Sequence, residues 1–238
     1  MVVFEPTDSV QLKKLFPQII EHYGPVYIRL FRKNAWSIFG ESDSFTLGNG
    51  CLLRHGSEVT LFASGIMVKE ALEAAEQLAG QGISAEVINL HTIKPLDSEL
   101  VLASVTKTGC CVTAENANII GGLGSAVSEC VSGGAPCPVL RVGVEDRFGE
   151  VGKMDYLQKE LHLTAAKQLL LDSVGCRVVT AAGPTGKNQR IHNSLIVHLS
   201  LDSWLRCIRR KTPAVIRRNP RRTERLTLEK HSAAKEHR

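Results

Sequence analysis

Residues 58–90 read EVTLFASGIMVKEALEAAEQLAGQGISAEVINL, and this stretch decides the fold class. EVTLFAS (58–64) is an apolar run with β-branched residues, which is typical of a buried strand. GIMVKEALEAAEQLAGQG (65–82) consists mainly of good helix formers and ends at a glycine, as many helices do. SAEVINL (84–90) has the pattern of a second strand. A strand, a helix and a strand in this order predict a parallel βαβ unit.

The same alternation continues outward from this unit. Strands are predicted at 109–115 and 138–144, and helices at 97–108, 121–134, 154–163 and 164–175. FTLGNGCLLRHG (45–56) reads as a strand that leads into the domain. Strands that alternate with helices predict an α/β domain over residues 45–175, with a doubly wound, mostly parallel sheet.

The first 35 residues have a different organisation. A strand at 2–4, a helix that begins after Thr7 or Asp8 and whose apolar face is interrupted by Pro17, and a strand at 26–31 form a β-α-β segment. This segment is too short to cover both faces of a parallel sheet, so residues 1–35 are interpreted as a domain remnant with 36–44 as a linker. An exposed strand edge predicts that the chain dimerises, binds a partner or aggregates.

Charge separates a third part of the chain. Residues 176–238 hold 15 Lys and Arg but 4 Asp and Glu, whereas residues 1–175 hold 14 basic and 20 acidic residues. We predict a basic, largely disordered tail over 176–238. Association with nucleic acid through phosphate contacts is one expectation for this tail. A frameshift or read-through product without a selected function is the other.

Composition excludes several classes of protein. No window of 18 consecutive apolar residues occurs, so no membrane span is expected. The first residues lack a basic stretch followed by a long apolar run, so we expect no signal peptide and a cytoplasmic location. The seven cysteines show no CxxC or CxxH spacing, so we expect no metal site.

Candidate site residues follow predicted strands, where ligands bind in open α/β sheets. Arg29 and Arg32 are candidates for bidentate binding of a substrate phosphate. The alternative for both is a solvated or salt-bridged surface arginine. His91 is a candidate general acid or base, or a histidine whose hydrogen bonds are satisfied within its loop. Asp146 and Arg147 are expected to form a local ion pair that fixes a turn.

GGLGSAV (121–127) resembles a dinucleotide-binding fingerprint that starts at Gly122. Val127 occupies the place of the third glycine, and residues 116–120 separate the predicted strand from the glycines. Both features favour a tight turn before a closely packed helix, with an anion at the helix N-terminus as the open alternative. AAGPTGKNQ (181–189) lacks the first glycine and the Ser or Thr of a P-loop, which favours a basic loop.

Four motifs in order resemble the carboxyl-terminal halves of transketolases. They are GPVYIRLFR (24–32), EVINLHTIKPLD (86–97), ENANIIGGLGSAV (115–127) and GVEDRFGEVG (143–152). The resemblance is strongest to prokaryotic split transketolase-like proteins. It is weaker to 1-deoxyxylulose-5-phosphate synthases and to the beta subunits of 2-oxo acid dehydrogenases. It covers residues 2–175 and none of the tail.

The resemblance implies that residues 1–35 are the end of a pyrimidine-binding domain and residues 45–175 a transketolase C-terminal domain. It implies that Arg32, the second arginine of the R-x-x-R stretch, binds a sugar phosphate, although Phe31 replaces the small residue usual before it. The family transfers a two-carbon ketol unit between sugar phosphates, using thiamine diphosphate and magnesium held by a GDG…N motif.

This chain contains no GDG, nor the earlier part of the pyrimidine domain that supplies the activating glutamate. We therefore expect that it binds no cofactor alone, is inactive alone, and works as a homodimer or with an N-terminal transketolase subunit. A non-catalytic docking module for other transketolase subunits and a 1-deoxyxylulose-5-phosphate synthase-like fragment are the alternatives.

Overall fold

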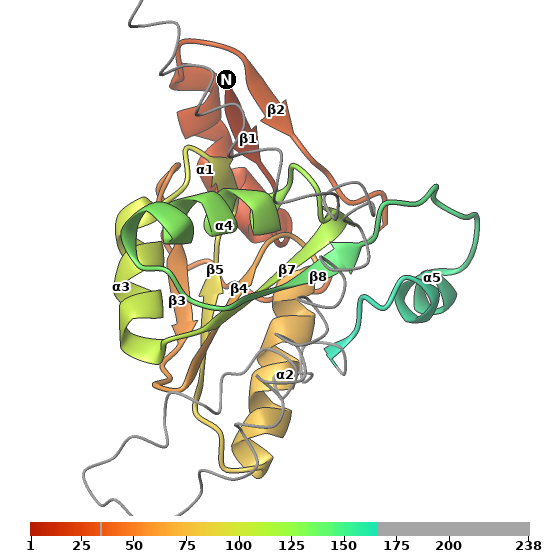
Figure 1. Ribbon diagram of the computed structural model, residues 1–238. Coiled ribbons are helices and arrows are strands. Elements are labelled where there is room, and N and C mark those ends of the chain that lie inside the picture. Colours follow the sequence, from red (N-terminus) through yellow and green to blue (C-terminus); the bar gives the residue numbers. More distant parts are fainter. Residues whose placement is uncertain (34, 166–238) are drawn as a thin grey trace, which may run out of the picture. The chain divides into compact units, whose positions relative to one another are not determined.

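The computed structural model describes residues 1–33 and 35–165, which lie within one compact unit, Met1–Pro184 (Figure 1). Eight strands and five helices occur in the described residues. The predicted helix 164–175, beyond Ala165, and the predicted tail 176–238 lie outside the described residues.

The larger sheet contains five strands in the order β3-β5-β4-β7-β8. Their bounds are Cys51–Arg54 for β3, Val59–Ala63 for β4, Ala85–Asn89 for β5, Cys111–Asn118 for β7 and Val139–Val144 for β8. The pairs β4–β5, β4–β7 and β7–β8 are parallel, and β3 pairs antiparallel with β5 at the edge. Every residue of β4 and β5 is buried, as expected for strands covered on both faces.

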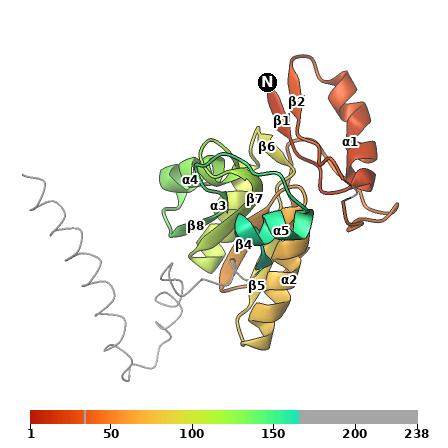
Figure 2. The ribbon, with the colours of Figure 1, turned by 90° about the vertical axis from the view of Figure 1, so that its right-hand side faces the viewer.

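Helices cover both faces of this sheet, which confirms the predicted doubly wound α/β class for the described residues (Figure 2). Helix α2 (Met67–Gly80) packs on one face, where Met67, Ala71 and Leu78 are buried against the strands. Helices α3 (Ser98–Thr108) and α4 (Leu123–Gly134) pack on the other face. The short helix α5 (Met154–Glu160) follows β8 and has no buried residue.

A smaller sheet joins the N-terminal segment to the rest of the unit. Its strand order is β2-β1-β6, with bounds Val26–Ile28 for β2, Val2–Phe4 for β1 and Thr92–Lys94 for β6. Strand β1 pairs parallel with β2 and antiparallel with β6, a strand that was not predicted from the sequence. Buried Gln11 of helix α1 (Ser9–Glu21) donates from Nε2 to Asn89 Oδ1 at 2.8 Å.

Helix α1 begins after Asp8, whose Oδ1 accepts from the Gln11 N–H at 2.9 Å. Pro17 lies inside this helix, which continues to Glu21 as expected for an element that ends before Gly24. Pro17 is exposed, while Leu15 and Ile19 on the opposite face are buried. The burial of that face compensates for the one backbone hydrogen bond that a proline removes.

No helix among the described residues is long and apolar enough to cross a membrane.

Candidate functional site

Two neighbouring pockets open beyond the carboxyl ends of strands β1, β2 and β4, and we call them together the cleft. The first has a volume of about 310 Å³ and the second of about 530 Å³. Phe31, Arg32, Ile66 and Asn116 line both. The cleft therefore lies where open α/β sheets place their ligands.

Arg29 lines the first pocket while it is held in an ion pair. Its Nη1 lies 3.1 Å from Glu5 Oε2, and its side chain is 26% exposed. The Arg29 backbone N–H donates to the Phe4 carbonyl at 2.8 Å, just after β2 ends. The guanidinium is thereby oriented and its charge balanced before any ligand arrives.

Arg32 has a different environment. It is exposed, lines both pockets, and forms no ion pair with another described residue. Phe31 and Lys33 flank it and also line the cleft. A guanidinium without a carboxylate partner at the mouth of a cleft is suited to bind an anion.

Glu5, which the sequence analysis did not select, is fixed at the wall of the first pocket. It is 5% exposed, and its Oε2 accepts from Ser64 Oγ at 2.8 Å as well as from Arg29. Burial raises the pKa of Glu5, while Arg29 and Ser64 act to lower it. The feature of the sequence that could have identified Glu5 is its position as a charged residue directly after the short apolar strand Val2–Phe4.

The glycines after β7 make room for a carboxylate of the chain itself. Glu115 is fully buried, and its two oxygens accept from the N–H groups of Leu123 and Gly124 at 2.9 and 2.8 Å. A Cβ at Gly122 would lie 1.8 Å from Glu115 Oε2. The anion at the N-terminus of α4 is therefore Glu115. Burial raises the pKa of Glu115, and the two N–H groups oppose this increase.

The predicted separation of residues 116–120 from the strand is wrong in part. Strand β7 continues to Asn118, so residues 116–118 belong to the strand. The prediction of a turn and a closely packed helix is nevertheless confirmed, because α4 begins at Leu123 against the Glu115 carboxylate. The space that a pyrophosphate would need at this helix end is filled.

His91 lies in the interior and lines neither pocket of the cleft. It is fully buried, and Nδ1 is 3.0 Å from Thr92 Oγ1. The rings of Phe4 and Phe45 meet it edge-on, with centroid distances of 5.8 and 6.3 Å. Nε2 has no hydrogen-bond partner in the described part of the chain, and burial lowers the pKa of His91 to about 4. The imidazole is therefore neutral at pH 7.

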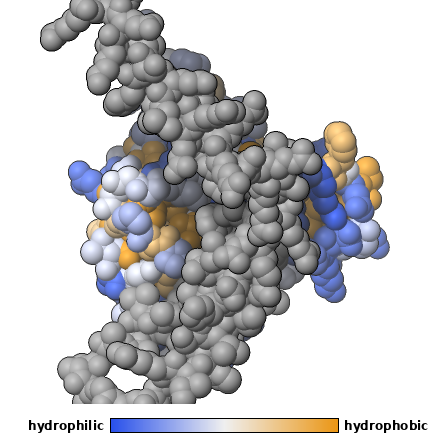
Figure 3. Space-filling view, viewed as in Figure 1, coloured by the Kyte–Doolittle hydropathy of each residue, from blue (hydrophilic) through white to orange (hydrophobic). Residues whose placement is uncertain are grey.

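The predicted ion pair between Asp146 and Arg147 does not form. Asp146 Oδ1 accepts from Asn118 Nδ2 at 3.3 Å, whereas Arg147 Nη2 lies 3.4 Å from Glu150 and 3.2 Å from Glu160. Both residues lie in a bend after β8, and each has its partner elsewhere in the chain. Apolar and hydrophilic residues lie side by side over this part of the molecule, at the right of Figure 3.

Residues 48–181 match the family described as "Transketolase, C-terminal domain". The chain belongs to this family. It is 61% identical over 165 residues to the 6-deoxy-6-sulfo-D-fructose transketolase subunit SqwH of Clostridium sp. (strain MSTE9), covering 69% of this chain and 51% of that protein. It is 43% identical over 162 residues to the putative transketolase C-terminal section of Methanocaldococcus jannaschii, covering 67% and 50%.

The structure agrees with this assignment to the transketolase family. A solved structure titled "Split gene transketolase, inactive beta4 tetramer" superimposes with a TM-score of 0.69 at 42% identity. The superposition covers 73% of this chain and 57% of that one. The chain spans about half the length of the two curated relatives named above.

The described residues of this transketolase C-terminal domain do not fit thiamine diphosphate with its metal. No group of three His, Cys, Asp or Glu side chains there is arranged to hold a metal ion. The N-terminus of α4 is filled by Glu115, and no GDG sequence occurs in the chain. No chemical step of this chain is therefore derived through this cofactor.

Proposed function

We propose that this chain is the C-terminal section of a split transketolase-like enzyme that depends on thiamine diphosphate. The complete enzyme transfers a two-carbon ketol unit between sugars that carry an anionic end. Membership of the transketolase family supports this proposal, as does the coverage of about half of each relative. Two relatives with transketolase names are 61% and 43% identical to this chain, whereas the relatives named 1-deoxy-D-xylulose-5-phosphate synthase are 36–38% identical, which favours the transketolase reaction over that of the synthase.

Within such an enzyme, the cleft binds the anionic end of the substrate. The observation that carries this role is the position of Arg32, which lines both pockets and has no ion-pair partner among the described residues. Its two terminal nitrogens can bind two oxygens of one phosphate or sulfonate. Arg32 thus positions the substrate and performs none of the bond-breaking chemistry.

The partner in this proposal is an N-terminal transketolase subunit that brings the cofactor and magnesium. The homologous structure is titled as an inactive beta4 tetramer, which supports both self-association and a need for a second subunit. A docking module without a catalytic role would share the partner but would not depend on Arg32.

Two classes of donor fit the cleft. A sugar phosphate is implied by the family, whereas the SqwH relative is named for 6-deoxy-6-sulfo-D-fructose. Both donors present a tetrahedral oxyanion, so a single arginine could bind either. The charge of the anion, which is two for phosphate and one for sulfonate at pH 8, is the chemical difference between them.

The test is reconstitution of the full chain with the N-terminal transketolase subunit of the same genome. Ketol transfer from fructose 6-phosphate and from 6-deoxy-6-sulfo-D-fructose is measured, with pyruvate as the donor for the synthase alternative. We expect activity with both subunits together and none with either alone.

Arg32→Gln should raise KM for the preferred donor roughly tenfold or more with a smaller effect on kcat, because a bidentate charged contact is lost. Arg54→Gln, on edge strand β3 and outside the cleft, is the matched control. Calorimetry of the isolated chain should show no binding of thiamine diphosphate with magnesium. Tight binding, or an unchanged KM in the Arg32 variant, would contradict the proposal.

A further inference from the structure

We propose that Glu5 is a specificity-determining residue of the cleft, because it neutralises Arg29 and so reduces the preference of the first pocket for doubly charged over singly charged anions. The inference rests on the proposed function, in which the cleft receives the anionic end of a sugar. It concerns the charge that this end carries, which the proposed function leaves open.

The position of the Glu5 carboxylate is fixed from several sides. Oε2 accepts from Arg29 at 3.1 Å and from Ser64 at 2.8 Å, and the Glu5 backbone N–H donates to the His91 carbonyl at 2.8 Å. Gly65, with φ +54°, passes so close that a Cβ would lie 2.7 Å from Glu5 Oε1. The carboxylate is therefore a permanent part of the pocket wall.

The charges around the first pocket are unequal. Arg29 interacts electrostatically with two buried carboxylates, Glu5 and Glu115, and each of them offsets its positive charge. Arg32 is the remaining cation that lines this pocket. An arriving anion therefore meets one uncompensated guanidinium, that of Arg32, beside an arginine whose charge is already offset by carboxylates.

Repulsion from a fixed carboxylate doubles when the charge of the ligand doubles. A dianion also gains more than a monoanion from Arg32, but it gains little from Arg29, whose charge is offset by Glu5 at 3.1 Å. Without the Glu5 charge, Arg29 would become a second available cation, and a dianion would gain most from it. One carboxylate thus sets the preference between the two ligand charges.

The experiment uses the full chain with sulfate as the dianion and methanesulfonate as the monoanion. Binding is followed at pH 8 and low ionic strength by NMR titration. Both probes present oxygens on sulfur, so charge is the main difference between them. We expect Glu5→Gln to tighten sulfate binding about tenfold and methanesulfonate binding about threefold, which changes the ratio of the two Kd values about threefold.

Arg29→Gln provides a second variant with the opposite sign. It leaves Glu5 without its cation, so the binding of sulfate should weaken more than the binding of methanesulfonate. This outcome can be measured even if the Glu5 variant does not fold. Arg32→Gln should weaken both probes and thereby assign the titrated site to the cleft, and Arg54→Gln should change neither. Circular dichroism melts establish that each variant is folded.

An unchanged Kd ratio in both the Glu5 and Arg29 variants would overturn the proposal. So would binding that is insensitive to Arg32→Gln, because the anions would then occupy another site. Neither result affects the ketol-transfer assay of the reconstituted enzyme, so the failure of this inference can be distinguished from the failure of the proposed function.

Discussion

Three buried ionisable residues have shifted pKa values: His91, Glu5 and Glu115. The shift at His91 makes the protein less stable as the pH falls, whereas the shifts at the two glutamates make it less stable as the pH rises. Burial lowers the pKa of His91 from 6.5 to about 4, so the folded protein binds fewer protons there than the unfolded chain. Its contribution to stability is present above pH 6.5 and is lost as the pH falls towards 4. Burial raises the pKa of both carboxyls, whose contributions are fullest below their ordinary value of 4.5 and decline as the pH rises.

The first prediction concerns His91→Gln, which removes the titrating ring but keeps a polar group beside Thr92. The wild type should lose about 2–3 kcal/mol of unfolding free energy relative to this variant between pH 6.5 and pH 4.5. Urea denaturation at several pH values measures the difference in unfolding free energy between the two proteins. The contributions of Glu5 and Glu115 cancel in this difference, because both proteins contain them. Parallel stability curves for the two proteins would show that His91 is not responsible.

At the scale of single elements, helix α4 begins where a buried carboxylate meets backbone N–H groups. Its Ncap residue is Gly122, which offers no side-chain hydrogen bond, so Glu115 of β7 provides the acceptor instead. The contact joins the helix to the strand that precedes it. The backbone N–H groups after the most conspicuous glycines of the sequence are therefore bound by a carboxylate of the chain itself.

Gly122→Ala tests this account of α4. The added Cβ would displace the Glu115 carboxylate and break two charge-assisted hydrogen bonds, at a cost of roughly 2–4 kcal/mol in unfolding free energy. Gly133→Ala in the same helix is the control, because a Cβ there meets nothing within 4 Å. The control should gain up to about 1 kcal/mol from helix propensity. Equal effects of the two changes in urea denaturation would disprove the account.

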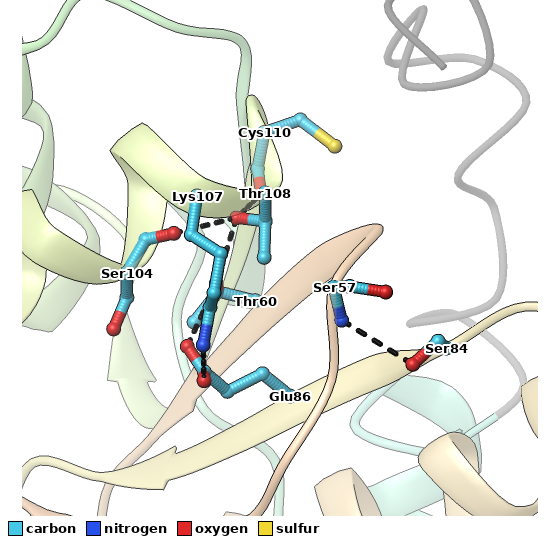
Figure 4. A network of polar contacts seen from close by, with 8 residues as sticks. All are labelled: Ser57, Thr60, Ser84, Glu86, Ser104, Lys107, Thr108 and Cys110. Carbon is cyan, nitrogen blue, oxygen red and sulfur yellow. Dashed lines mark hydrogen bonds and ion pairs between the residues drawn. The ribbon is translucent and has the colours of Figure 1, made fainter. Parts of the chain in front are cut away.

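A second polar contact fixes helix α3 against the sheet (Figure 4). The Glu86 carboxylate on β5 is 1% exposed and is ion-paired with Lys107 of α3. Thr60 of β4 lies 2.8 Å from Thr108 through their hydroxyl oxygens. Together these contacts link β4, β5 and the last turn of α3.

Lys107→Met should destabilise the protein by roughly 1–2 kcal/mol, because it leaves a buried carboxylate without its cation. The half-exposed position of the lysine keeps this below the value for a fully buried pair. Lys69→Met, which removes the i,i+4 partner of Glu73, should have an effect below about 1 kcal/mol. Thermal or urea unfolding provides the measurement, and a similar effect of both changes would contradict it.

At the scale of the whole described unit, several apolar side chains are exposed on the N-terminal segment. Phe16 and Ile20 of α1 are 47% and 70% exposed, and Tyr27 of edge strand β2 is 50% exposed. An edge strand and exposed apolar side chains are both suited to bind another polypeptide. This segment is therefore the expected contact for a second copy or for the N-terminal subunit.

We expect the isolated chain to self-associate at micromolar concentrations. The double variant Ile20→Lys with Tyr27→Lys should weaken this association at least tenfold, or about 1.4 kcal/mol, as measured by sedimentation equilibrium. Phe148→Lys changes a residue that is 98% exposed outside this segment and should leave association unchanged. A monomeric wild type, or equal effects of the two variants, would contradict the expectation.

Local patterns were sufficient to predict much of this fold. Apolar runs at 58–64 and 84–90, with a helix between them, predicted β4, α2 and β5, because a strand buried on both faces must be apolar along its length. Short-range patterns did not show that Thr92–Lys94 pairs with β1. This pairing depends on contact between segments far apart in the sequence.

By itself, the sequence determined the α/β class, the family and Arg32 as the candidate anion-binding residue. Only the tertiary structure showed that Glu5 neutralises Arg29, that Glu115 fills the N-terminus of α4 and that His91 is buried outside the cleft. The reason is physical. Periodicity depends on neighbours along the chain, whereas the charge and protonation of a site depend on groups brought together from distant strands, such as Glu5 and Ser64.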